Sequence, residues 1–224
     1  MHEAEITSED LLAAILSDKF ALAAARLRQV QSITSEILMV PEIDIPRKEA
    51  CDCYVIGANT ACITLTSHLL ERYCKELLIQ VDFGPSFMRL NFQFDGTSPS
   101  DLSVYLNKDL SQTLAACKSK SLLSKEMWKV LDNYREIFRN GFSHYDPARI
   151  LKGLTYKVSI TNNPDEPIEE REFKLHDIPN VAFAVEVFAE KNAWKYLVTV
   201  ENFIRSTIRY FHNPDIDPGL PVVS

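Results

Sequence analysis

The feature that most limits how this chain can fold is a long amphipathic stretch, residues 49–79. Its apolar residues recur with the helical period of about 3.6: Tyr54, Ala58, Ala61, Ile63, Leu65, Leu69, Tyr73, Leu77 and Leu78. Such a stripe lines one face of a helix and needs a partner to bury it. Glycine is also scarce, at 6 of 224 residues. The sequence therefore predicts a mainly α protein, a helical bundle with this helix as its spine.

Two segments change to the two-residue period that is typical of β-strands. They are residues 87–94 and residues 155–176. Turn-forming residues follow the first at Asp95-Gly96 and divide the second at Asn162–Pro167. We expect a small β-hairpin or sheet inserted among the helices, in which the two segments pair.

Prolines suggest how the chain is divided. Pro41 and Pro46 follow shorter helical patterns and are predicted to end an N-terminal helical arm, residues 1–48. Residues 49–213 then form the main helical domain, with the short strands inside it. Residues 214–224 are rich in proline and form a C-terminal tail.

Three further helices are expected inside the main domain. A capping signal at Ser98–Asp101 opens one that reaches about Cys117. Another begins at residues 121–125, and the last runs over Pro179–Phe211. Gly141 lies where a C′ glycine would end the second of these helices.

The cysteines and the N-terminal residues indicate a cytoplasmic protein. The chain has 5 Cys, without a C-x-x-C pair, which is typical of reduced thiols. On a helix Cys51 and Cys53 would point about 200° apart, so we expect no metal site there. The acidic, polar first ten residues are unlike a signal peptide. No apolar run approaches the roughly 18 residues of a membrane-spanning helix, so we expect no membrane partner.

Three residues suited to chemistry lie close together around Gly141. Arg139, Asn140 and His144 fall near the end of one amphipathic helix. On a straight helix Arg139 and His144 would point about 140° apart. A break of the helix at Gly141 would instead let His144 return beside Arg139.

Basic side chains concentrate around this motif. Residues 118–152 contain eight Lys or Arg and four Asp or Glu, whereas the whole chain has a net charge of −7. Arg135, one helical turn before Arg139, and Tyr145 are the residues that we expect to help bind a substrate. A basic island on an acidic protein fits a local phosphate site rather than general coating of nucleic acid. The alternative is a solvated helix face.

The motif resembles the signature of the HEPN superfamily, named after nucleotide-binding domains of higher eukaryotes and prokaryotes. That signature is an Arg, commonly followed by a polar residue, with a His after four to six intervening residues. Arg139 and His144 match the four-residue form, and Asn140 takes the polar position. Leu69-Leu70-Glu71 on the preceding long helix also looks HEPN-like. The resemblance covers residues 49–150 and extends to the last helix.

The resemblance implies a HEPN-like helical bundle that forms a homodimer and brings two Arg/His sets into one cleft. It implies a metal-independent endoribonuclease that needs no cofactor, acting as a toxin or an anti-phage defence effector. RNA would be its substrate, and an antitoxin protein a possible partner. One subgroup of such toxins has a Tyr two residues after the His, which receives nucleotides. Asp146 holds that position here, and Tyr145 directly follows His144, so this form of control is not expected.

The chemistry that the resemblance implies fits the residue types. Metal-free RNA cleavage uses the neighbouring 2′-hydroxyl as nucleophile and needs a proton acceptor and a cation. His144 exchanges protons near neutral pH, and Arg139 presents a charged donor fork to phosphate oxygens. Asn140 would position either group or donate to the phosphate. These three are the expected catalytic residues.

Two other interpretations remain open. One is a non-catalytic HEPN module that binds a nucleotide, RNA or a protein. The other is a helical scaffold without a site, in which Arg139 stabilises the negative end of a helix dipole. His68 and Glu71, three residues apart on the long helix, are weaker candidates for the same cleft.

Overall fold

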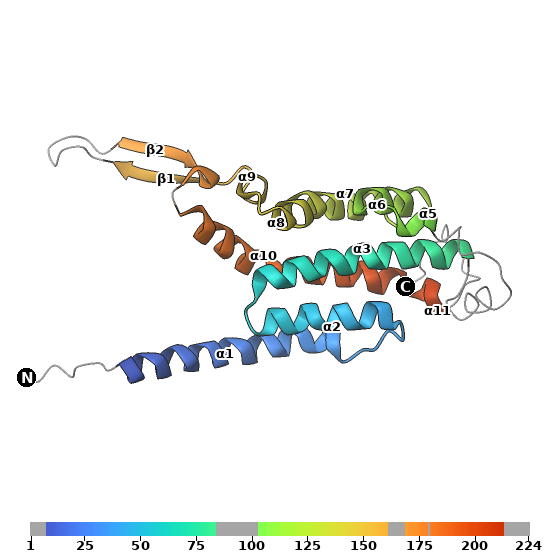
Figure 1. Ribbon diagram of the computed structural model, residues 1–224, viewed down its shortest axis with the longest axis horizontal. Coiled ribbons are helices and arrows are strands. Elements are labelled where there is room, and N and C mark those ends of the chain that lie inside the picture. Colours follow the sequence, from blue (N-terminus) through green and yellow to red (C-terminus); the bar gives the residue numbers. More distant parts are fainter. Residues whose placement is uncertain (1–7, 84–102, 161–168, 179, 213–224) are drawn as a thin grey trace, which may run out of the picture.

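The computed structural model describes residues 8–83, 103–160, 169–178 and 180–212. Helices form most of this part of the chain, and one short two-stranded sheet projects from one end (Figure 1). The prediction of a mainly α fold with a small β insertion is therefore confirmed. The predicted strand at 87–94 and the predicted tail at 214–224 lie outside the described residues.

Three long helices make up the N-terminal part of the described chain: α1 (Ser8–Thr34), α2 (Pro41–Val55) and α3 (Asn59–Phe83). The prolines do not end the arm as predicted. Pro41 begins α2. Proline is tolerated there because the N–H group of a first helical residue makes no hydrogen bond within the helix, so its absence costs nothing. Pro46 lies inside α2, and the helix continues across residues 48 and 49.

The prediction of one helix over 49–79 is wrong. The chain turns at Gly57, whose φ of +82° is in the left-handed region that glycine adopts without strain. A Cβ at Gly57 would also approach the Arg26 guanidinium to 3.3 Å. The apolar pattern continues through this turn because α2 and α3 each bury a face, so periodicity alone did not reveal the break.

Shorter elements follow: α5 (Ser103–Leu106), α6 (Leu110–Ser119), α7 (Lys125–Tyr134), the π-helical turn η2 (Arg135–Asn140), α8 (Gly141–Ser143) and α9 (Pro147–Ile150). The helix predicted to reach Cys117 is broken, because Asp109 is extended and starts α6 with a capping box to Gln112. Ser124 caps α7 by accepting from the Met127 N–H at 3.0 Å, which confirms the predicted start.

The chain ends in the predicted hairpin and the predicted long helix. Strands β1 (Thr155–Ile160) and β2 (Glu169–Lys174) pair antiparallel, with Tyr156 opposite Phe173. The 3₁₀ turn η3 (Leu175–Asp177), α10 (Val181–Thr207) and α11 (Arg209–His212) follow. Their order and type agree with the expectations for 155–176 and 179–211.

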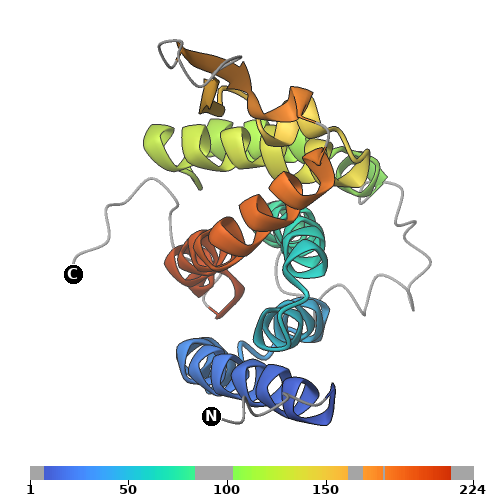
Figure 2. The same ribbon diagram turned by 90° about the vertical axis from the view of Figure 1, so that its left-hand side faces the viewer.

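Helix α3 is the centre of the bundle (Figure 2). It packs against α2 on one side and against α10, α6 and η2 on others. Leu69, Leu70 and Tyr73 of α3 are fully buried, and the Tyr73 hydroxyl donates to the Ile204 carbonyl of α10 at 3.1 Å. The predicted role of a central spine thus belongs to α3.

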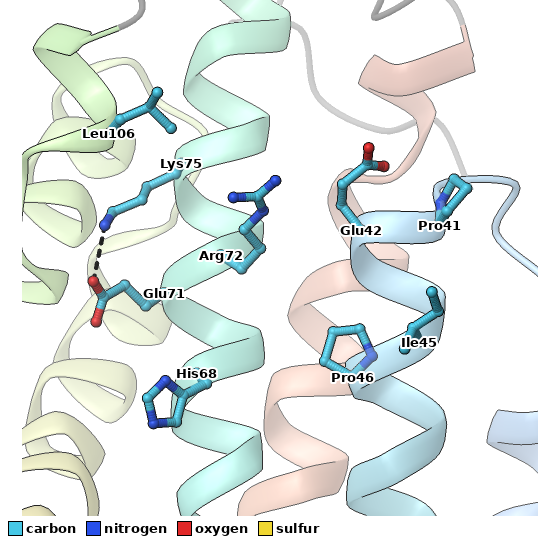
Figure 3. Close-up of a pocket in the computed structure, with 9 residues that line it drawn as sticks. All are labelled: Pro41, Glu42, Ile45, Pro46, His68, Glu71, Arg72, Lys75 and Leu106. Carbon is cyan, nitrogen blue, oxygen red and sulfur yellow. Dashed lines mark hydrogen bonds and ion pairs between the residues drawn. The ribbon is translucent and has the colours of Figure 1, made fainter.

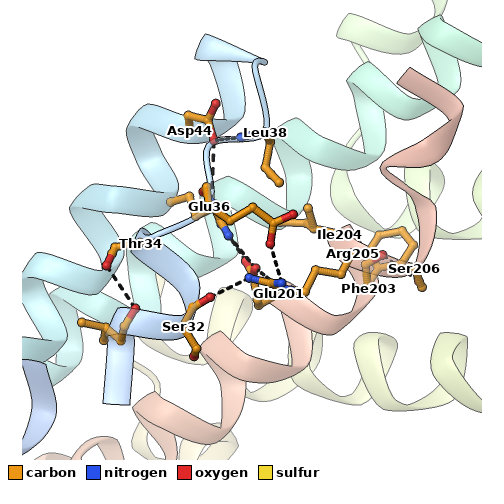
Figure 4. A network of polar contacts seen from close by, with 12 residues as sticks. Ser32, Thr34, Glu36, Leu38, Asp44, Glu201, Phe203, Ile204, Arg205 and Ser206 are labelled. Atoms are coloured by element: carbon orange, nitrogen blue, oxygen red, sulfur yellow. Dashed lines mark hydrogen bonds and ion pairs between the residues drawn. The ribbon is translucent and has the colours of Figure 1, made fainter. Parts of the chain in front are cut away.

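A buried ion-pair network joins α2 to α10 (Figure 4). Arg47 donates from Nε and Nη2 to the Glu201 carboxylate at 2.7 and 2.6 Å, and from Nη1 to the Glu36 carbonyl at 2.7 Å. Arg205 donates to Glu201 at 2.6 Å. Desolvation lowers the pKa of Arg47, but the bonds to Glu201 outweigh it and keep that pKa above its ordinary value.

Candidate functional site

The helix that carries the motif does not end at Gly141. Gly141 is buried and has a helical φ of −65°, so the predicted C′ role is wrong. A Cβ there would come within 2.7 Å of Ile150 Cγ1, closer than packed atoms allow. Gly141 is therefore needed for the close approach of α9, not for a break in the chain.

The chain turns instead after His144. Tyr145 takes a positive φ of 45°, and the Asp146 N–H donates to the Gly141 carbonyl at 2.8 Å. Asp146 then caps α9 by accepting from the Arg149 N–H at 3.2 Å. His144 is thus the C-cap residue of α8, which directly follows the η2 turn that carries Arg139, rather than part of a segment folded back from Gly141.

Arg139 is held beside α3. Its Nη2 lies 3.8 Å from Glu71 Oε2, and its side chain is 36% exposed. Glu71 also accepts from Lys75 Nζ at 2.9 Å (Figure 3). The Leu-Leu-Glu segment therefore buries its two leucines and directs Glu71 to the motif. Within the described part of the chain, Glu71 is the one polar partner of Arg139, which leaves donors of its guanidinium available to a ligand.

Arg135 and Arg139 do not act on the same partners, although they lie four residues apart. Arg135 donates to Asp132 at 2.8 Å and lies 2.6 Å from Glu136. These interactions outweigh desolvation and raise the pKa of Arg135. Both arginines belong to the π-helical turn η2, but Arg135 pairs with neighbours along its own helix, whereas Arg139 pairs with Glu71 of α3. The structure thus places Arg135 in a local ion pair and Arg139 at α3.

Glu136 is the common partner of several polar side chains near the motif. Asn140 Nδ2 lies 3.5 Å from Glu136 Oε2, and Arg149 Nη1 donates to the same oxygen at 2.8 Å. Desolvation raises the pKa of Glu136, but Arg135, Asn140 and Arg149 outweigh it and hold the pKa below its ordinary value. Asn140 therefore has a weak intramolecular contact that a ligand can replace.

His144 and Tyr145 are exposed. With the described residues, neither side chain makes a hydrogen bond or an ion pair. They lie at the end of the same helical unit as Arg139, and α8, which precedes them, packs on α3. Since the chain does not break at Gly141, the expected return of His144 beside Arg139 is not seen; an exposed imidazole follows the helical run that carries a partly free cation.

A groove of about 510 Å³ adjoins Glu71 (Figure 3). Its walls are the first two turns of α2, the middle of α3 and Leu106 of α5. His68 and Glu71 line it, so the structure places these two weaker candidates together. Sequence reasoning missed Arg72 and Lys75, although they follow Glu71 on neighbouring faces of the same helix.

The thiols take no part in the site. Cys51, Cys62, Cys74 and Cys117 are buried and free, and burial raises the pKa of Cys51 and Cys62 to about 12. In the described ranges, no group of three or more His, Cys, Asp or Glu side chains is arranged to hold a metal ion. None of the described helices is both long and apolar enough to cross a membrane.

Comparison with protein-family models, with curated proteins and with solved structures found no match for this chain.

Proposed function

We propose that the chain is a HEPN-type endoribonuclease that cleaves RNA without a metal ion. The observation that carries the proposal is the pairing of Arg139 of η2 with Glu71 of α3, 3.8 Å apart, near the end of a helical unit that is followed by the exposed His144. The contact joins the two segments on which the HEPN resemblance depends, Arg139–His144 and Leu69–Glu71.

In the proposed reaction, the 2′-oxygen of a ribose attacks the adjacent phosphorus and gives its proton to a base. The bond from phosphorus to the next 5′-oxygen breaks, and that oxygen takes up a proton. The products are a 2′,3′-cyclic phosphate and a 5′-hydroxyl. His144 is the proton-transfer group, Arg139 stabilises the charge that develops on the phosphorane, and Asn140 orients the phosphate.

One imidazole serves either as base or as acid at a given moment, so a second proton-transfer group is required. We propose that a second copy of the chain supplies it, with two His144 side chains facing one cleft. Action as a toxin or defence effector in the cytoplasm, with an antitoxin protein as regulator, belongs to the same proposal. In this proposal Tyr145, which is 55% exposed, helps to bind the RNA.

A non-catalytic RNA-binding module is the second candidate. Two observations favour it: Arg135 and Asn140 contact Glu136, and no described residue holds the His144 ring in one orientation. A catalytic base is commonly oriented by a hydrogen bond. Both candidates place phosphate beside Arg139, and they differ in whether a bond is broken.

The test is cleavage of mixed cellular RNA by purified protein in excess EDTA. We expect cleavage by the wild type and 5′-hydroxyl product ends, with losses for His144→Ala and Arg139→Ala. Arg28→Ala, which removes an exposed arginine on α1, is the control and is expected to cleave normally. Undiminished cleavage by both motif variants would refute the assignment of the site. RNA binding without cleavage by the wild type would select the second candidate.

A further inference from the structure

Three lysines that no carboxylate neutralises lie together where α6 meets α7, on the side of the bundle away from α1 (Figure 1). Lys125 and Lys129 are exposed and one turn apart on α7, so they project from the same side of that helix. Lys118 is exposed in the last turn of α6. With the described residues, none of the three forms an ion pair. We call these lysines the α6–α7 basic surface.

Lys118 is held in place by an uncharged partner. Its Nζ lies 3.7 Å from the centre of the Trp128 ring, which is a cation–π contact. Trp128 comes directly before Lys129 and three residues after Lys125, so its ring belongs to the same side of α7. A carboxylate would cancel the charge of the ammonium group, whereas the ring fixes its position and leaves that charge available to a ligand.

The acidic side chains of α6 and α7 do not cancel this charge. Helix α6 contains no Asp or Glu, and α7 contains only Glu126 and Asp132. Asp132 already accepts from Arg135 Nε at 2.8 Å. Glu126 has no partner among the described residues, and at 100° per residue it falls beyond Lys129, on the side away from Trp128. Three free cations therefore face one free carboxylate, on a chain whose net charge is −7.

The basic surface lies on the helical run that carries Arg139. Helix α7 continues directly into η2. Lys129 and Arg139 are ten residues apart, which corresponds to about 15 Å along a helix axis. An RNA strand with one phosphate at Arg139 can therefore follow α7 past these lysines.

We infer that the α6–α7 basic surface binds the phosphate backbone of a single-stranded RNA beside the Arg139 site. The release of counterions from the phosphates supplies affinity without regard to base sequence. An acidic protein is a poorer fit, because protein partners are usually anchored by large apolar side chains, and Val130 is the only exposed one on α6 and α7. The inference rests on the proposed function, because RNA is the ligand assigned to Arg139 there.

The experiment measures how RNA binding depends on salt. The ligand is a fluorescently labelled single-stranded oligoribonucleotide, followed by anisotropy in EDTA at several salt concentrations. The double variant Lys125→Gln, Lys129→Gln removes two cations. It should make the slope of log K against log salt shallower by about 1.4, at about 0.7 for each phosphate of a single strand.

The matched control is the double variant Lys191→Gln, Lys195→Gln. These lysines are also exposed and one turn apart, on α10, but the exposed Glu186 and Glu190 lie in the same stretch of that helix and balance their charge. The slope of this variant should equal that of the wild type. An equal change in both double variants would mean that RNA does not distinguish the two faces, and it would overturn the inference.

Lys118 is tested by two substitutions at one position. Lys118→Gln should make the slope shallower by about 0.7. Lys118→Arg keeps a cation over the Trp128 ring and should keep the wild-type slope. Because the substituted lysines are all exposed, the fold is expected to persist in every variant, and circular dichroism checks this.

The outcomes separate the basic surface from the nuclease. If the wild type cleaves RNA and the α7 double variant keeps the slope of its control, the basic surface is wrong and the proposed nuclease stands. If the wild type binds but does not cleave, and the lysine variants make the slope shallower, the nuclease is wrong and the basic surface stands. Failure of the wild type to bind the oligonucleotide overturns both.

Discussion

Arg47 and Arg139 are two arginines that the bundle treats in opposite ways. Arg47 is 3% exposed and donates three hydrogen bonds, two of them to Glu201. Arg139 has a side chain that is 36% exposed and one ion pair at 3.8 Å. Both lie between helices, so position in the bundle does not explain the difference; the number and closeness of their partners does.

The difference teaches which charge is available for binding. A buried guanidinium that loses its carboxylate leaves an unpaired charge in a poorly solvated place, so Arg47 is tied to the stability of the fold. An exposed guanidinium with one distant partner can exchange that partner for phosphate at little cost. We therefore expect stability and function to separate cleanly between these two residues.

The largest effect is expected at the buried pair. Glu201→Ala removes the partner of both Arg47 and Arg205 and should lower the free energy of unfolding by about 3–5 kcal/mol. Urea denaturation followed by circular dichroism measures it. The double variant Arg47→Met, Glu201→Leu is the control, since replacing both charges by apolar groups should recover most of the loss. If the double variant is as unstable as Glu201→Ala, the lost stability does not come from the charge of Arg47 that Glu201→Ala leaves unpaired.

The next effect is functional and falls on the other arginine. Arg139→Ala should lower the rate of RNA cleavage by about 10²–10³-fold, the loss typical when one group that stabilises transition-state charge is removed. Its urea midpoint should stay close to that of the wild type, because an exposed ion pair contributes about 0–1 kcal/mol. If Arg139→Ala were as unstable as Glu201→Ala, the proposed contrast would fail.

The sequence predicted the elements better than their ends. Local signals account for the cap at Ser124 and for the hairpin that pairs Tyr156 with Phe173. A local signal also accounts for the start of α2 at Pro41, but the same proline is equally typical of a helix end. Gly57 was missed because apolar periodicity continues through the turn that it makes. A period reports which residues are buried, and two helices packed on each other can continue one period across a break.

Gly141 shows why the geometry of the site was harder to foresee. A glycine after an amphipathic helix is typical of a C′ position. Here Gly141 instead leaves room for the side chain of Ile150 from α9. Glu71 was visible through its Leu-Leu-Glu pattern, whereas its contact with Arg139 depends on how α3 and η2 pack. Residues from separate segments, such as Arg72 and Ile45 in the groove, carry no common signal in one sequence.

A smaller effect on stability is expected at Gly141, the buried glycine between Arg139 and His144. Gly141→Ala should destabilise the fold by about 1–3 kcal/mol, the usual range for overpacking, since its Cβ would meet Ile150 Cγ1 at 2.7 Å. Urea denaturation measures this change. Adding Ile150→Ala should recover part of the loss by removing the clashing atom. A stabilising Gly141→Ala would mean that α9 moves away freely.

The smallest effect is expected at Glu136, the exposed counterpart of Glu201. Its pKa lies below the ordinary 4.5 because Arg135, Asn140 and Arg149 outweigh its desolvation. Such a carboxylate stabilises the fold above its unfolded pKa, and this contribution disappears as the pH falls through the lower folded value. Because the Glu136 side chain is 46% exposed, Glu136→Gln should change stability at neutral pH by no more than about 0.5 kcal/mol. Urea midpoints of wild type and variant should then converge as the pH falls through the lowered pKa of Glu136. A difference that persisted at acid pH would come from packing rather than charge, and Glu136 would then resemble the buried network more than the exposed motif.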